Sequence, residues 1–111
     1  MWGICLTVDE DNLYQKAVEY QPDPDNRTIH IIQPVTNKIV SINDIKVIEI
    51  PPIFIYGDFV SPANHPDTIG KIETIIWHFK NNEYNYYISV NGKKVSKRYD
   101  EKELIPCCTG K

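Results

Sequence analysis

The side chains best suited to binding chemistry lie in the second half of the chain, where aromatic and basic residues are close in sequence. Such a surface can hold a peptide or a methylated lysine or arginine by cation–π contact, or a nucleic-acid strand by stacking and phosphate contacts. The competing interpretation is that the aromatic rings fill a core and the cations cover a solvent-exposed hairpin. The candidate partner-binding residues are Tyr56, Trp77, Tyr87, Lys93, Lys94, Lys97, Arg98 and Tyr99.

Residues that could perform catalysis or hold a metal form no recognisable pattern. The three histidines are far apart in sequence, and no motif links them to a serine, cysteine or aspartate. Cys107 and Cys108 are adjacent thiols that could bind a soft metal or react with oxidants, but no Cys/His pair has zinc-site spacing. A strand end with one thiol buried and one exposed is the favoured interpretation. We therefore predict that the chain is not an enzyme and has no cofactor and no metal site.

Composition places the chain among soluble globular proteins of one domain, or two very small ones. It has 111 residues, 41% of them hydrophobic and 24% charged, and a net charge of −3. Residues 1–50 hold four Lys/Arg against eight Asp/Glu, whereas residues 51–111 hold eight against seven. No apolar run approaches the ~20 residues needed to cross a bilayer, no signal peptide is evident, and the odd cysteine count is a poor disulfide framework. We predict a cytoplasmic protein whose acidic first half suits a basic partner.

The candidate residues are positioned by a predicted series of strands joined by tight turns. Residues 72–79 and 84–90 are rich in β-branched and aromatic side chains, and Asn91-Gly92 is the typical sequence of a two-residue hairpin turn. A returning strand at 93–99, a 3₁₀ turn at 100–104 and a short strand at 105–107 follow. Alternation along the first of these strands predicts two faces, one with Ile75, Trp77 and Phe79 and the other with Ile72, Thr74, Ile76 and His78.

The first half of the chain predicts a similar succession of elements. Strands are expected at 2–8, 13–20, 28–32, 38–42 and 46–50, with turns at the acidic segment 9–12 and at the segment 22–26, which holds two prolines. Pro51-Pro52 marks the boundary between the halves. When the halves are compared with a shift of 55 residues, residues 35–41 match residues 90–96 at four of seven positions. We therefore predict two degenerate tandem copies, residues 1–50 and 54–107, packed together.

One sequence pattern resembles a known group of proteins. It runs Tyr-Gly-Asp-x-Val, Gly-x-Ile-x-x-Ile-x-Trp-His-Phe-Lys, Tyr-Tyr-Ile-x-Val-Asn-Gly-Lys-Lys-x-Ser-Lys-Arg-Tyr and Glu-Leu, and it covers about half the chain. It is similar to small uncharacterised bacterial proteins with SH3-like barrels, some of which resemble the immunity partners of polymorphic toxins. The resemblance implies an all-β fold of SH3-like or Tudor-like barrels and a binding function.

These observations predict a non-enzymatic protein-binding module of the immunity type. The alternative is a module that binds RNA or single-stranded nucleic acid through the basic and aromatic face of the second barrel. A protein partner is favoured because the net charge is negative and acidic residues are interspersed among the cations of residues 93–103. The alternative predicts an affinity that falls steeply as salt concentration rises.

Overall fold

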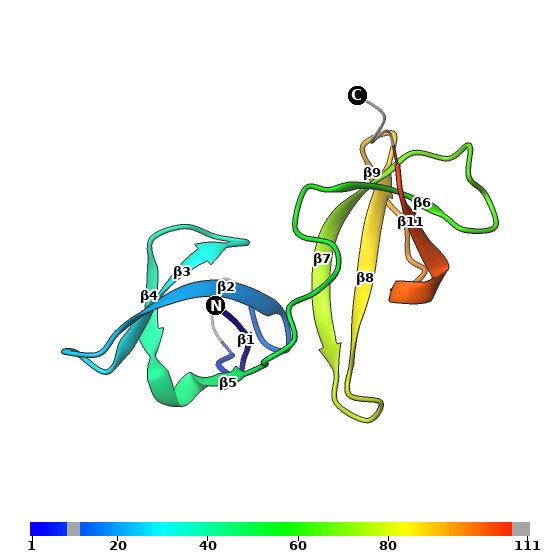
Figure 1. Ribbon diagram of the computed structural model, residues 1–111. Helices are drawn as coiled ribbons and strands as arrows, with labels where there is room; N and C mark the ends of the chain where they lie inside the picture. The colour runs from blue at the N-terminus through cyan, green and yellow to red at the C-terminus, as the bar shows by residue number, and fades with distance from the viewer. Residues whose placement is uncertain (9–11, 108–111) are drawn as a thin grey trace. The chain divides into compact units, whose positions relative to one another are not determined.

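The computed structural model describes residues 1–8 and 12–107. Within them the regular structure consists of strands in two antiparallel sheets and two single-turn 3₁₀ helices (Figure 1), so the predicted all-β fold is confirmed. The chain divides into two compact units, Met1–Pro51 (unit 1) and Pro52–Lys111 (unit 2), on either side of the peptide bond between the two adjacent prolines. The predicted acidic turn at 9–12 lies largely outside the described residues, as does Cys108.

Unit 1 is a five-stranded sheet with the strand order β4-β3-β2-β1-β5. Its elements are β1 (Trp2–Cys5), β2 (Ala17–Asp23), β3 (Thr28–Gln33), β4 (Lys38–Ser41), the 3₁₀ helix η1 (Ile42–Asp44) and β5 (Ile45–Val47). Alternate side chains of β2, β3 and β4 point to one side and form the core, since every second residue of a strand faces the same way. The core residues are Cys5, Leu13, Val18, Tyr20, Ile29, Ile31, Val40 and Ile45.

Unit 2 is a six-stranded sheet with the strand order β10-β8-β7-β6-β11, in which β9 also pairs with β8. Its elements are β6 (Phe59–Pro62), β7 (Gly70–His78), β8 (Glu83–Val90), β9 (Lys93–Lys94), β10 (Tyr99–Asp100), the 3₁₀ helix η2 (Glu101–Glu103) and β11 (Leu104–Pro106). The long hairpin of β7 and β8 is visible in Figure 1. The sheet of unit 2 has the same strand order as that of unit 1 when β9 and β10 are taken as the counterpart of β4. In each unit a 3₁₀ helix directly precedes the last strand.

The turn between β8 and β9 forms as its sequence predicts. Asn91 has a φ of 53° and Gly92 a φ of 79°, the left-handed conformation that a type I′ turn requires at both positions. The returning strand is shorter than expected, because β9 ends at Lys94. The Val95 amide still donates to the Ile88 carbonyl at 2.9 Å, and strand pairing with β8 returns at Tyr99. The prediction of one continuous strand over 93–99 was therefore wrong.

A β-bulge changes which side chains of β7 face the core. The register between β7 and β8 shifts between Ile72 and Thr74, so that Glu73 is an extra residue on its strand. Because an extra residue reverses the alternation of faces, Ile72 is buried like Ile75 and Trp77. The prediction that Ile72 faces away from Ile75 and Trp77 was wrong for this reason.

Strand β2 extends further than the sequence indicated. We expected the strand to end at residue 20 and Pro22 to lie in a turn, but β2 runs to Asp23 and includes Pro22. The proline is tolerated because β1 pairs with β2 only as far as Glu19, which leaves Pro22 with a neighbouring strand on one side alone.

Candidate functional site

The four predicted cations lie on the surface of unit 2. Lys93 and Lys94 form β9, Lys97 and Arg98 follow in the irregular segment, and all four are exposed. The Nζ atom of Lys97 lies 3.6 Å from a carboxylate oxygen of Glu103 and 5.0 Å from the ring centroid of Tyr99. One of the four charges is therefore partly compensated within the unit, although an exposed ion pair of this kind contributes only ~0–1 kcal/mol.

Most of the predicted aromatic side chains make contacts within unit 2. Trp77 and Tyr99 are 9% and 8% exposed, and Trp77 packs edge-to-face on Tyr84 at 4.9 Å between ring centroids. The Tyr56 hydroxyl donates a hydrogen bond to the Ile75 carbonyl at 3.2 Å, and burial raises the pKa of Tyr56. Tyr56, in a turn, and Tyr87, on β8, are both half-buried.

The eight predicted residues do not form one continuous surface. Trp77 pairs with Tyr84 at one end of β8, whereas Lys94 pairs with Ser89 near the other end. Five residues of strand correspond to a separation of about 17 Å. Lys97 and Tyr99 do come together, and with Lys102 and Glu103 they line a hollow of about 260 Å³.

An exposed aromatic residue that the sequence analysis did not select is Phe59, on β6. Its side chain is 56% exposed and lies between two hollows of about 400 and 310 Å³. Ile69, 52% exposed, lines the first hollow, and Ile53, 65% exposed, lines the second. We call Phe59, Ile69, Ile53 and the two hollows the Phe59 surface. The signal in the sequence is that Phe59 directly precedes Val60, so if Val60 faces the core, Phe59 faces the other side.

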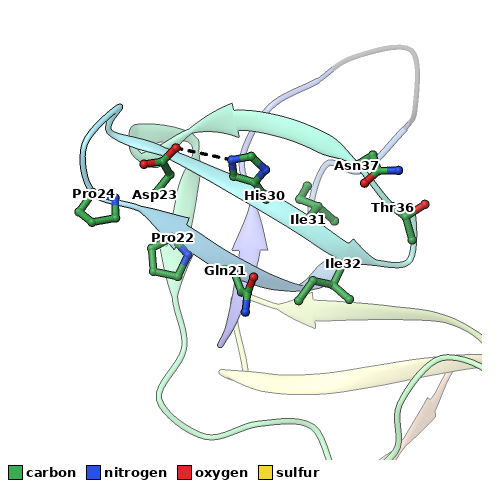
Figure 2. Close-up of a pocket in the computed structure, with 9 residues that line it drawn as sticks. All are labelled: Gln21, Pro22, Asp23, Pro24, His30, Ile31, Ile32, Thr36 and Asn37. Carbon is green, nitrogen blue, oxygen red and sulfur yellow. Dashed lines mark ion pairs between the residues drawn. The ribbon is translucent and has the colours of Figure 1, made fainter.

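A second concave surface lies on β2 and β3 of unit 1, and we call it the Asp23 groove. Its volume is about 510 Å³. Figure 2 shows Asp23 and His30 at one end, joined by an ion pair of 3.7 Å, and Thr36 and Asn37 at the other. The sequence analysis did not find this groove, because its residues on β2 and on β3 become neighbours only through the pairing of these two strands.

Among the described residues, no group of three or more His, Cys, Asp or Glu side chains is placed to hold a metal ion. Across residues 1–8 and 12–107, no helix has the length and apolar character needed to cross a membrane. What these residues offer is an apolar surface around an exposed ring and a polar groove with one carboxylate.

The fold is that of a small all-β protein of two units, each with a candidate surface. A family model matches residues 40–105, from within β4 to within β11, and the chain belongs to this family of unknown function, DUF6960. No curated protein and no solved structure matches the chain at a significant level. The matched residues include the whole Phe59 surface except parts of the second hollow beyond residue 105, whereas the Asp23 groove lies outside the match.

Proposed function

We propose that this chain is a non-enzymatic protein-binding module whose partner docks on the Phe59 surface. The observation that carries the proposal is an aromatic side chain, more than half exposed, between two hollows with exposed isoleucines. Exposing such a group of apolar side chains to water is unfavourable, and contiguous exposed apolar surface marks interaction sites. Aromatic residues that fit into a partner's pocket, or present pockets beside them, dominate the energetics of protein interfaces.

The proposal extends to fold type, partner and location. We take the two units as copies of one SH3-like or Tudor-like barrel, a view supported by their common strand order and the 3₁₀ helix before each last strand. We take the partner to be a basic protein of the toxin type that immunity proteins neutralise, and the location to be the cytoplasm. The excess of four negative charges in residues 1–50 would accelerate encounter with a basic partner.

Nucleic-acid binding stays a prediction with less support. Four exposed cations on β9 and the following segment favour it. However, single-strand binding combines phosphate contacts with stacking on exposed rings, and Trp77 and Tyr99 are both buried. Tyr56 and Tyr87 are half-buried, so none of the four predicted aromatic rings is fully exposed.

Capture of a partner from the host lysate, with and without nuclease, tests the proposal. The tagged wild-type chain should retain a protein in both lysates, and Phe59→Ala should lose it. Phe79→Ala is the matched control, because Phe79 is also exposed but lines neither hollow of the Phe59 surface. Retention that disappears with nuclease, or an equal effect of the two variants, would contradict the proposal.

A further inference from the structure

We infer that the Asp23 groove of unit 1 is a second binding site, which takes an arginine or lysine side chain from an extended segment of a protein. The inference rests on the proposed function only in that the ligand belongs to a protein. Its residues lie in unit 1 between positions 21 and 37, separate from the Phe59 surface.

The anionic group of the groove is the carboxylate of Asp23. Its Oδ2 atom accepts a hydrogen bond from Asn26 Nδ2 at 2.8 Å, and this bond is the main reason that the pKa of Asp23 is lowered. The carboxylate is therefore ionised at neutral pH. The backbone amides of Asp25 and Asn26 also donate to this carboxylate, whereas the contact with His30 Nε2, at 3.7 Å, is longer than a hydrogen bond. The Asp23 side chain is 28% exposed, so a donor from outside the turn can still reach the carboxylate.

The shape of the groove suits a long cationic side chain. Arginine and lysine have apolar stems that pack on apolar surface while the charged end reaches a carboxylate. Pro22 and Pro24 line the groove near Asp23, and Ile32 lines it towards Thr36, so apolar surface is present at both ends (Figure 2). A guanidinium group can also bind a carboxylate through two parallel hydrogen bonds, which makes arginine the better ligand of the two.

The far end of the groove can hold the backbone that carries this side chain. Thr36 and Asn37 lie there, and Gln21 lies between the two ends in Figure 2. Hydroxyl and amide side chains can donate to and accept from a peptide backbone. The groove volume of about 510 Å³ falls within the range of ~300–1,000 Å³ that is usual for ligand sites.

Charge also selects the ligand. Residues 1–50 hold eight Asp/Glu against four Lys/Arg, so the unit attracts cations and repels anions. His30 is the basic side chain that faces Asp23 within the groove, and Asp25 follows in the same turn without lining it. Asp23 and Asp25 therefore form a matched pair for an experiment, since replacing either removes one negative charge from the same turn.

Nuclear magnetic resonance titration of the full chain tests this inference. The probe is the peptide acetyl-Ser-Val-Arg-Val-Ser-amide, and the matched peptide has citrulline, which is neutral and of similar shape, in place of arginine. The arginine peptide should shift the amide signals of β2, β3 and residues 34–37 of the wild-type chain. Asp23→Asn should weaken this binding at least about tenfold, because it removes the charge but keeps an acceptor for Asn26. Asp25→Asn should change it less than about twofold.

Three results would overturn the inference: equal weakening by the two variants, equal binding of the citrulline peptide, or no shift in the groove at millimolar peptide. The test is independent of Phe59. If the captured partner still needs Phe59 while the groove fails this titration, only the groove is rejected. If the groove binds the arginine peptide but Phe59→Ala retains the partner, only the proposed function is rejected.

Discussion

Glu101 shows how one side chain can hold several parts of unit 2 in place. Its carboxylate accepts a hydrogen bond from the Tyr86 hydroxyl at 2.8 Å and another from the Ile53 backbone amide at 3.3 Å. Phe54 then packs edge-to-face on Tyr86 at 5.6 Å between ring centroids. The segment that begins unit 2 is thereby fixed to η2 and to the centre of β8, and this segment carries Ile53 of the Phe59 surface.

Removing the hydroxyl of Tyr86 should destabilise the protein. In Tyr86→Phe the carboxylate of Glu101 loses a donor, which should lower the free energy of unfolding by about 1–3 kcal/mol. The control is Tyr87→Phe, because no hydrogen bond of the Tyr87 hydroxyl is found among the described residues, and the expected change is below about 0.5 kcal/mol. Urea denaturation followed by circular dichroism measures both values. Equal stability of the two variants would show that the Tyr86 bond contributes nothing.

Buried tyrosines should make the fold sensitive to alkaline pH. Burial, and next the charge of Glu101, raise the pKa of Tyr84 to about 12, and burial chiefly raises the pKa of Tyr86 as well. A raised pKa means that the folded state favours the neutral phenol. The resulting stability is complete below the unfolded pKa of about 10 and is lost as the pH rises towards the folded value.

Denaturation curves at neutral pH and at about pH 11 test this expectation. The free energy of unfolding should be lower at the higher pH, and this decrease should be smaller for Tyr84→Phe than for the wild type. For Tyr14→Phe, which removes an exposed phenol, the decrease should equal that of the wild type. A wild-type stability that is constant or rises over this interval would show that the phenols are not held neutral by the fold.

At the scale of elements, η2 is fixed by hydrogen bonds at its first residues. The Asp100 side chain accepts from the backbone amides of Lys102 and Glu103, while the Glu103 side chain accepts from the Asp100 amide. This reciprocal arrangement is a capping box. It sets the direction in which the chain enters β11, the edge strand whose Pro106 lines the second hollow of the Phe59 surface.

Loss of this cap should be measurable. Asp100→Ala removes the Oδ1 atom that accepts both hydrogen bonds and should lower the free energy of unfolding by about 1 kcal/mol. Asp100→Asn keeps a side-chain oxygen in the same position, so it should lose less than half as much. Chemical denaturation of the three proteins decides the matter, and an alanine variant as stable as the wild type would show that η2 does not depend on its cap.

Elements with local signals could be predicted from the sequence, and those set by pairing could not. The Asn91-Gly92 turn and the 3₁₀ turn before the last strand were visible as short residue patterns, and both form. The side of the sheet on which Ile72 lies could not be predicted, because the bulge at Glu73 depends on how β7 pairs with β8. The Asp23 groove could not be predicted for the same reason. It depends on the continuation of β2 through Pro22, which is possible because β2 has only β3 as a neighbour there.

The exposure of the candidate residues could be predicted in part. The sequence indicated correctly that Lys93, Lys94, Lys97 and Arg98 are exposed on one segment. It could not separate aromatic residues that fill the core from those that face solvent, because both faces of β7 and β8 carry large side chains. Phe59 was passed over although its position next to Val60 suggested the outward face.

At the scale of the whole molecule, the charge and the candidate surfaces are divided between the two units. Residues 1–50 have an excess of four negative charges and carry the Asp23 groove, whereas residues 51–111 have an excess of one positive charge and carry the Phe59 surface. The family match covers β5 and almost all of unit 2 but stops short of the groove. On this account the Phe59 surface is the feature that family members are expected to share, and the groove adds selectivity for a basic partner.

The most direct test of the central claim is the affinity of the purified partner, measured by calorimetry for the wild type, Phe59→Ala and Phe79→Ala. The account predicts that Phe59→Ala raises Kd by about thirtyfold or more, the effect of losing a central aromatic contact of at least ~2 kcal/mol. Phe79→Ala should change Kd by less than about threefold. Equal Kd values for the wild type and Phe59→Ala would contradict the claim that the partner docks on the Phe59 surface.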